Sequence, residues 1–364
     1  MSAVEERPAA FTPSLLRWSS GAFDLSRGLL GAAAVVIPLV VGFLLGLVEA
    51  SVLVTIGALN LLLVEAPLPA RTSAHVLAIA CATNALAFGA GTVVGLAPRV
   101  LEIPFVALGI FVALWGTRRP RWENVSFFAA VMFVFAVGVP ATTPWGILLR
   151  PSAVLLGGVW ALGALATVSL LWPRTPRNLF AAPSPGPSIE GGPGPGGLGH
   201  AAVVAITATF GFWVALELGL PRDYWVMLTV LVALRPDLAA TFAYTAARVL
   251  GTIVGASAAF LVTTLIVVPW FLFPILAVTT ALCFATRAVS YLVFAVWITL
   301  TVIVLLNLVY SGGPSLAIAR VIDTVLGGAL AFGAALALAI SGALGRPPFG
   351  PKAARPQIHA SPSR

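Results

Sequence analysis

Arginines inside apolar stretches are the residues of this sequence with the clearest chemical potential. Arg150, Arg248 and Arg320 each lie among long runs of aliphatic and small side chains. A charge at the middle of a membrane costs at least about 2.5 to 3.5 kcal/mol on insertion scales, so such groups should face a bundle interior, a cavity or a carboxylate. Guanidinium groups bind carboxylates through paired hydrogen bonds. These arginines are therefore candidates for attracting a small organic anion.

The surroundings of two of these arginines differ. Arg320 and Asp323 are three residues apart and share one helical face, so an ion pair between them is the alternative to substrate binding. Arg150 has Ala153 at the same spacing and no carboxylate there. We therefore expect Arg150 to be the stronger candidate for substrate attraction, with snorkelling to the outer interface as its alternative.

A second group of candidates surrounds one short apolar run. Arg235 and Asp237 flank Pro236 after that run, where a simple turn with a positive anchor is the alternative interpretation. Tyr224 and Trp225 begin the run and could stack on an aromatic substrate. Tyrosine and tryptophan also populate the interfacial belts of ordinary membrane proteins, so this alternative stays open.

Two further residues are candidates for proton transfer. His75 begins one apolar run and Glu65 ends the run before it. Histidine titrates near neutral pH, so the pair could relay protons, although a lone interfacial histidine commonly has no such role. Cys81 and Cys283 lie inside apolar runs, where we expect small buried hydrophobes and neither a disulfide nor a metal site.

The elements that must position these residues are predicted to be transmembrane helices. The 364 residues are 60% hydrophobic and only 9% charged, whereas soluble domains carry roughly 25% charged residues. Twelve apolar runs are delimited by charge, proline or glycine: 29–48, 50–64, 74–97, 101–117, 124–140, 150–172, 200–219, 224–234, 243–268, 270–286, 288–310 and 316–341. The sequence therefore predicts an all-α integral membrane protein of about twelve transmembrane helices.

Internal repetition divides these runs into two sets of six. Pro144, Arg150 and the Gly157-Gly158 pair recur 170 residues later as Pro314, Arg320 and Gly327-Gly328, and the pattern GTVVG at 91–95 recurs as GTIVG at 251–255. Six spans is an even number, so the halves should be parallel repeats related by a pseudo-two-fold axis along the membrane normal.

The domain boundaries follow from this division. We expect an N-terminal cytoplasmic segment at 1–27, with an interfacial helix or a polar lead-in as its two interpretations. The first repeat is predicted at 28–172, a flexible Gly/Pro-rich linker at 173–199, the second repeat at 200–341, and a basic disordered tail at 342–364.

The second run of each half is too short to cross a bilayer. Uncharged residues extend only over 50–64 and 224–234, and at about 1.5 Å per residue neither spans roughly 30 Å of hydrocarbon. Short segments at corresponding positions of two halves point to a transport site. The alternatives are a tilted helix buried in protein, or, in the second half, a single helix over 218–234.

Charge asymmetry predicts the orientation. With both termini in the cytoplasm, fifteen of the twenty basic residues fall on the inner side, and only Arg99, Arg150, Arg222 and Arg320 fall toward the outside. The net charge of +8 would suggest nucleic-acid binding in a soluble chain, but here the basic residues lie between apolar runs. We therefore expect the lipid bilayer as partner and no nucleic acid, with homo-oligomerisation possible in principle.

The segment 223–256 resembles the signature of the fusaric acid resistance (FUSC) family. It has an aromatic pair after an acidic residue, an apolar run, a Pro-Asp turn, and an arginine before GTIVG; the segment 319–338 resembles that family's last span. The resemblance implies a six-plus-six helical exporter of aromatic and other organic acids, and plant aluminium-activated malate channels look like relatives.

The sequence lacks the patterns typical of enzymes. We find no HExxH, no GxSxG and no Walker A pattern, so we expect neither catalysis nor a cofactor nor an ATP-driven cycle. The leading hypothesis is a secondary transporter that exports small organic or aromatic carboxylates across the cell membrane. An anion channel of the same architecture and a non-transporting scaffold are the alternatives.

Overall fold

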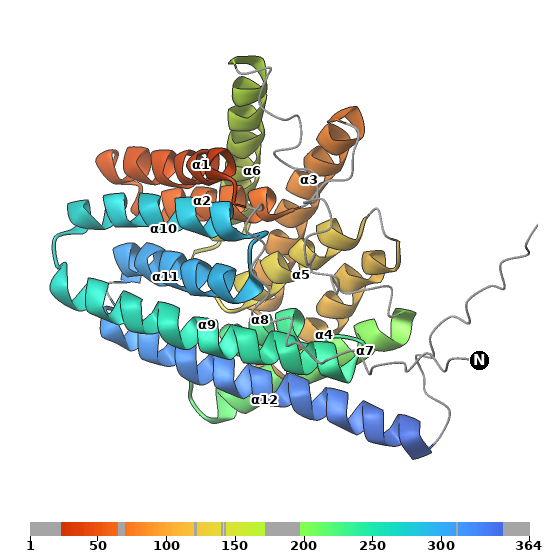
Figure 1. Cartoon of the computed structure of the whole chain (residues 1–364). Coiled ribbons are helices and arrows are strands. Elements are labelled where there is room, and N and C mark those ends of the chain that lie inside the picture. Colours follow the sequence, from red (N-terminus) through yellow and green to blue (C-terminus); the bar gives the residue numbers. More distant parts are fainter. Residues whose placement is uncertain are drawn as a thin grey trace, which may run out of the picture.

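The computed structural model describes residues 23–64, 70–119, 122–139, 141, 143–171, 197–310 and 312–344, and within them the chain is helical without strands. The helices are α1 (Leu25–Leu44), α2 (Val48–Leu63), α3 (Ala70–Val94), α4 (Arg99–Trp115), α5 (Glu123–Val137), α6 (Gly146–Leu171), α7 (Gly197–Glu217), α8 (Tyr224–Ala233), α9 (Leu238–Leu265), α10 (Leu272–Thr286), α11 (Tyr291–Tyr310) and α12 (Pro314–Leu344) (Figure 1). Each predicted apolar run overlaps one of them. Most of the predicted N-terminal segment, linker and tail lies outside the described residues.

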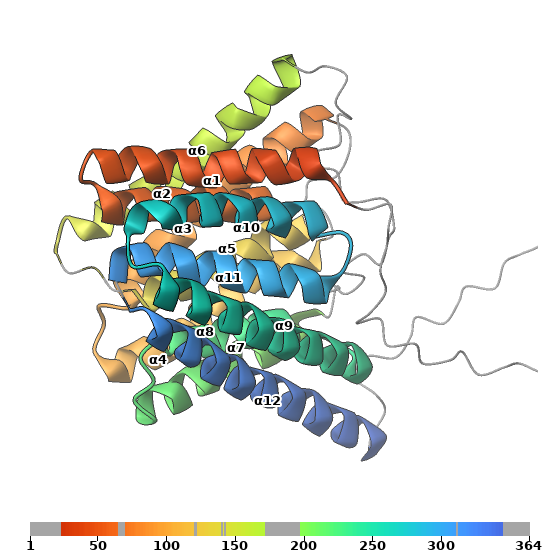
Figure 2. The ribbon, with the colours of Figure 1, turned by 60° about the vertical axis from the view of Figure 1, so that its left-hand side comes forward.

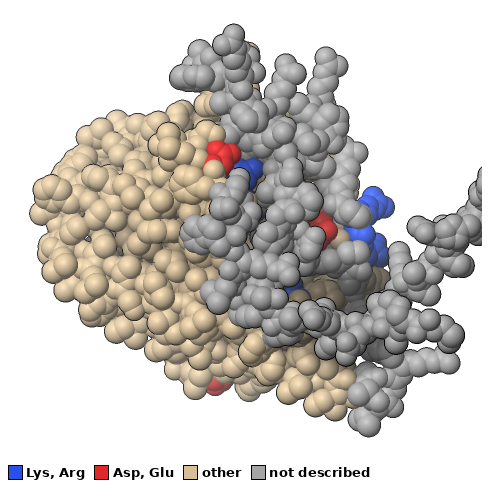
Figure 3. Space-filling view, viewed as in Figure 1, with Lys and Arg blue, Asp and Glu red and all other residues tan. Residues whose placement is uncertain are grey.

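The described helices have the lengths and surfaces of a membrane protein. Nine of them are long and apolar enough to cross a membrane. Large hydrophobic side chains are exposed on many helices, for example Val100 at 84% and Leu86 at 74%. Figure 3 shows one face whose left-hand part displays no charged side chain. Such a surface would be unstable in water, so the described chain is an all-helical, multi-pass membrane protein.

Aspartates begin three of the helices. The side chains of Asp24, Asp223 and Asp237 accept hydrogen bonds from backbone N–H groups at the starts of α1, α8 and α9. Partial burial opposes ionisation of Asp24, but hydrogen bonds from the Ser26 hydroxyl and the Arg27 N–H outweigh it and lower the pKa of Asp24. These caps satisfy N–H groups that a helix leaves without partners.

The same helix pairings occur in both halves of the chain. In the first half α1 packs on α2, α2 on α6, α3 on α5 and α6, and α4 on α5; in the second half α7 packs on α8, α8 on α12, α9 on α11 and α12, and α10 on α11. The halves join where α1 packs on α10 and α4 on α7. Figure 2 shows α1 and α10 side by side, with α11 and α9 beneath them.

Glycines allow the tightest of these contacts. A Cβ atom at Gly91 of α3, or at Gly95 directly after α3, would collide with the backbone of α5. One at Gly251 or Gly255 of α9 would collide with the backbone of α11. The repeated glycine pattern therefore marks equivalent close helix approaches in the two halves, as expected for small residues in membrane helices.

The two short runs form short, buried helices. Helix α8 has 10 residues, which gives about 15 Å of length. Twelve of the 16 residues of α2 and eight of the 10 residues of α8 are buried. Helix α7 ends at Glu217, and a turn separates it from α8, so the alternative of a single helix over 218–234 is wrong.

Candidate functional site

Arg320 lies in the interior of the second half of the chain. Its side chain projects from α12, the residue is 5% exposed, and its guanidinium carbon lies 4.9 Å from the centroid of the Trp225 ring on α8. The Nη1 atom of Arg320 has no hydrogen-bond partner. A buried guanidinium with an unsatisfied N–H is costly unless water or a ligand completes it.

Asp323 lies one turn further along α12 and is completely buried. Neither of its carboxyl oxygens has a hydrogen-bond partner, and among the described residues it forms no ion pair with Arg320. The ion pair that the three-residue spacing allowed is therefore not formed. The two side chains interact electrostatically, but no hydrogen bond joins them, so both carboxyl oxygens of Asp323 and Nη1 of Arg320 are left without a partner.

Arg248 brings a second positive charge toward Arg320. It lies on α9, is 8% exposed, and its Nε atom has no partner in the described structure. Arg248 is close enough to Arg320 to interact with it electrostatically, as are Tyr224 of α8 and Tyr291 of α11. Two buried like charges repel each other, and an anion between them would relieve that repulsion.

Arg235 forms a third buried cation at the end of α8 that faces α9. Its guanidinium carbon lies 4.2 Å from the centroid of the Tyr244 ring, and that ring lies 4.9 Å from the ring of Tyr291. The backbone N–H of Arg235 donates to Thr241 Oγ1 at 2.9 Å, whereas its Nε and Nη1 atoms have no partner. Asp237 is exposed and caps α9 by accepting from the Ala240 N–H at 2.7 Å, which is a structural role.

Unsatisfied polar atoms concentrate in the second half. Among the described residues, every buried side-chain nitrogen or oxygen without a hydrogen-bond partner lies between His200 and Asp323, except Oδ1 of Asn84. The set includes threonine hydroxyls on four helices: Thr209, Thr245, Thr252, Thr280, Thr299 and Thr301. Native proteins satisfy most buried polar groups, so this interior is suited to hold water or a polar ligand.

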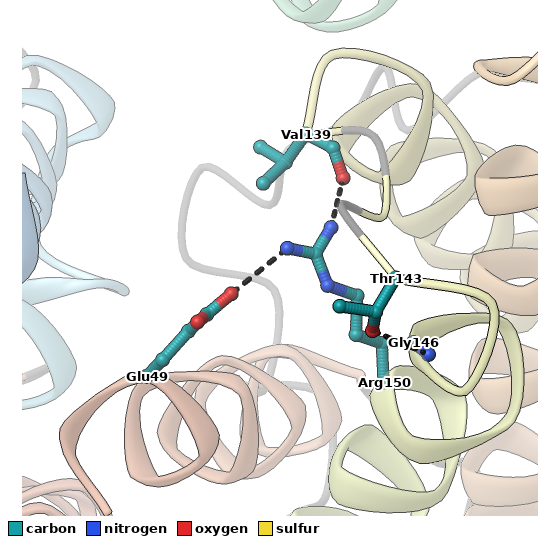
Figure 4. Close-up of polar contacts among 5 residues, drawn as sticks. All are labelled: Glu49, Val139, Thr143, Gly146 and Arg150. Carbon is teal, nitrogen blue, oxygen red and sulfur yellow. Dashed lines mark hydrogen bonds and ion pairs between the residues drawn. The ribbon is translucent and has the colours of Figure 1, made fainter.

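Arg150 is satisfied by the protein itself (Figure 4). Its Nη2 atom lies 2.8 Å from Oε1 of Glu49 at the start of α2, and its Nη1 atom donates to the carbonyl oxygen of Val139 at 2.6 Å. Glu49 precedes Arg150 by 101 residues, so a spacing of one helical turn could not indicate this partner. The premise that Arg150 has no carboxylate partner is wrong, because Glu49 pairs with it. The role of Arg150 in substrate attraction stays a prediction, and the pairing weakens the reason for ranking it above Arg320.

The remaining predicted candidates fall in different places. Tyr224 and Trp225 are 0% and 1% exposed, so neither belongs to an interfacial belt. His75 is exposed on α3, and Glu65 lies outside the described residues. The proposed relay between these two residues stays a prediction.

Further charged groups lie directly before the start of α8. Arg222, in the turn before α8, lies with its guanidinium carbon 4.2 Å from the Tyr310 ring centroid. Burial raises the pKa of the neighbouring Asp223, while the Tyr224 N–H, Arg99 and Arg222 oppose that rise.

Sequence reasoning missed Tyr244 and Tyr291 as site residues. Tyr244 precedes Arg248 by four residues and so shares its helical face, a signal that the sequence contained. Tyr291 had no comparable local signal, because only the packing of α11 on α9 brings it to Tyr244.

Comparisons with known proteins cover the half that contains this cluster. Residues 199–334 match the family model described as fusaric acid resistance protein-like. The inner membrane protein YccS of Escherichia coli (strain K12) is 33% identical over 141 residues, which are 37% of this chain and 19% of that protein. No solved structure matches. The resemblance predicted from 223–256 and 319–338 is thus confirmed for the second half, while the likeness to plant malate channels stays a prediction.

Proposed function

We propose that this chain, whose residues 199–334 are of the fusaric acid resistance protein-like family, is a secondary transporter of small organic anions in the inner membrane. The observation that carries the proposal is the group formed by Arg235, Arg248 and Arg320. All three are at least nine-tenths buried, and each has at least one guanidinium nitrogen without a protein partner. We call these three residues the arginine group.

The arginine group lacks a paired counter-ion in the described part of the chain. None of its three members forms an ion pair with a described carboxylate. Buried charges are normally paired, and a carboxylate that enters the second half could accept charge-assisted hydrogen bonds from the free N–H groups. The hydrogen bonds that these N–H groups do not form within the protein could then stabilise a bound substrate.

Aromatic rings beside these arginines favour substrates that carry a ring. Trp225 faces Arg320, while Tyr244 and Tyr291 lie at Arg235. Rings of this kind offer edge and face contacts to an aromatic acid while the guanidinium groups bind its carboxylate. We therefore place aromatic carboxylates first among the expected substrates.

We further propose that the halves are parallel repeats and that only the second has kept the anion site. The matching helix pairings and the glycine contacts support a repeat. At an offset of 160 residues Phe88 takes the position of Arg248, and at an offset of 170 Ala153 takes that of Asp323. With Arg150 bound to Glu49, these differences favour a pathway within the second half over one shared by Arg150 and Arg320.

Our proposals for membrane orientation and transport direction rest on the distribution of basic residues and on the similarity to YccS. The excess of basic residues on one side favours cytoplasmic termini, and the likeness to YccS, an inner membrane protein, favours the inner membrane. We propose export of acids that accumulate in the cytoplasm. An anion channel with the same helices is the second candidate, favoured by the same unpaired arginines.

Flux through purified protein in proteoliposomes tests the proposal. We expect saturable uptake of radiolabelled benzoate, 4-hydroxybenzoate or benzenesulfonate by the wild type and at least several-fold slower uptake by Arg320→Gln. Arg119→Gln is the matched control, because Arg119 carries the same charge in an exposed position. A channel would instead give current that does not saturate at low anion concentration. Equal flux in Arg320→Gln and the wild type would overturn the proposal.

A further inference from the structure

Asp323 is a buried carboxyl group in the second half, and anion binding by the arginine group gives it no role. It is completely buried, both carboxyl oxygens lack hydrogen-bond partners, and it lies one turn from Arg320 on the same helix. An ionised carboxylate in that setting would be strongly destabilised, whereas a protonated one would be tolerated. The observed arrangement, with no ion pair to Arg320, therefore fits a carboxyl group that carries a proton.

The groups around Asp323 and Arg320 come from the helices that pack on α12. Helix α8 contributes Tyr224 and, from its capping residue, the carboxyl group of Asp223; α9 contributes Arg248, and α11 contributes Tyr291. No ionisable residue of the remaining neighbour, α7, interacts with either side chain in the described structure. Among the described residues, Arg320 is the cation that interacts with Asp323.

We infer that Asp323 takes up a proton when an organic anion binds Arg320 and releases it when the anion leaves, so that one proton accompanies each anion. This inference rests on the proposed function. It assigns Asp323 a coupling role that a mere structural carboxyl would not have.

The step conserves charge and protons. When no anion is bound and Asp323 is ionised, it pairs with Arg320, which is within reach through a change of rotamer because residues i and i+3 are neighbours on a helix. The observed arrangement, in which that pair is absent, corresponds to the protonated carboxyl group before an anion binds. A proton from water then adds to a carboxylate oxygen of Asp323, the ion pair is lost, and the anion takes its place at Arg320. When the anion departs, the O–H bond of Asp323 breaks, the proton returns to water, and the pair with Arg320 forms again.

Competition gives the coupling a definite sign. The ionised carboxylate both occupies Arg320 and repels an incoming anion, so deprotonation of Asp323 must weaken anion binding. Anion affinity should therefore fall as pH rises. Movement would follow the combined gradients of anion and proton, so that an acid accumulating on one side leaves together with a proton.

The first half offers an internal comparison. Ala153 takes the position of Asp323 there, and Arg150 has Glu49 as a permanent partner. Glu49 has a side chain that is 67% exposed, so it can remain ionised in contact with water. In the first half Arg150 has an exposed counter-ion, Glu49. In the second half the corresponding Arg320 lies beside a buried acid, Asp323, with which it forms no ion pair.

The test measures anion and proton movement together in proteoliposomes that contain a pH-sensitive dye, with the membrane potential clamped at zero. Benzenesulfonate is the probe, because it stays ionised at every pH used and cannot itself carry a proton. For the wild type we expect one proton per anion and at least about a five-fold loss of apparent affinity between about pH 6 and pH 8. For Asp323→Asn we expect anion flux that persists, carries no proton and changes less than about two-fold over that range.

Controls separate the possible failures. Asp323→Glu should restore proton movement, and Asp237→Asn, which changes an exposed capping residue, should behave as the wild type in its pH dependence. Anion flux in the wild type without proton movement, or the same pH dependence in Asp323→Asn, overturns the inference and leaves the proposed function standing. Absence of flux for every anion tested in folded wild type overturns the proposed function and the inference with it.

Discussion

Arg150 and Glu49 join the ends of α6 and α2 through an ion pair of 2.8 Å between Nη2 and Oε1. The same guanidinium group donates to the carbonyl oxygen of Val139, just after α5. One side chain thus fixes three elements of the first half. We conclude that Arg150 stabilises the fold, and the first prediction follows from this role.

Arg150→Gln should lower the midpoint of thermal unfolding while leaving anion flux per folded molecule within about two-fold of the wild type. Glutamine loses the contact to Glu49 and at best weakens the one to Val139. Glu49→Gln should cost less, because the Glu49 side chain is 67% exposed, and exposed pairs contribute about 0 to 1 kcal/mol. Unfolding of the two single variants and the double variant, followed by fluorescence in detergent, measures the coupling. If Arg150→Gln is stably folded but loses anion flux, Arg150 contributes to transport and its role is not only structural.

Arg320→Lys should transport poorly although it keeps the charge. A lysine cannot offer the planar pair of N–H groups to a carboxylate and interacts differently with the Trp225 ring. We expect a rise of at least several-fold in the KM for benzoate, with the protein as stable as Arg320→Gln. Concentration-dependent uptake measures this change. A lysine variant with wild-type KM would mean that charge alone is sufficient.

Tyr244→Leu should reduce the preference for aromatic anions. The Tyr244 ring contacts both the Arg235 guanidinium and the Tyr291 ring, so leucine removes a stacking surface at that end of the site. We expect the ratio of benzoate to propionate uptake to fall at least about three-fold, equivalent to about 0.6 kcal/mol. Tyr244→Phe retains the ring and serves as the control. An unchanged ratio in the leucine variant would remove Tyr244 from substrate selection.

Gly255→Val should prevent the close contact of α9 and α11. A Cβ atom at Gly255 would collide with the carbonyl oxygen of Val296 and with Thr299, so the helices must separate. We expect a strong loss of folded protein, measured as the monodisperse fraction after detergent extraction. Gly333→Val is the matched control, because a Cβ atom there meets no atom within 4 Å. Equal yields of the two variants would show that the close approach is not required.

Single-cysteine labelling should report cytoplasmic exposure at both Ser184 and Ser363. The prediction rests on the excess of basic residues in the segments that lie on the same side of the membrane as Ser184 and Ser363. The background replaces Cys81 and Cys283, which are buried, with alanine. Leu45→Cys, in the exposed turn between α1 and α2, should react with an impermeant reagent from the outside. Outside labelling of Ser184 or Ser363 would reverse the orientation.

The sequence by itself determined the helices of this protein. Each long apolar run has to form a helix in a membrane, because no other open structure satisfies its backbone hydrogen bonds there. Charges, prolines and glycines punctuate the runs, and the predicted limits of α2 at 50–64 and of α8 at 224–234 agree with the structure within two residues. The glycine patterns at 91–95 and 251–255 also indicated close contacts, because only small residues permit them.

Only the tertiary structure decided which charges are paired. Local spacing suggested a pair between Arg320 and Asp323, yet no hydrogen bond or ion pair joins them in the described structure. Arg150 instead pairs with Glu49, which lies 101 residues earlier on α2. The rotation and register of one helix against another set such contacts, and they arise from the packing of many side chains together rather than from any spacing along the chain. For the same reason the sequence indicated Arg150, Arg248 and Arg320 as the chemical groups, and the fold alone decided that only Arg150 pairs with a described carboxylate.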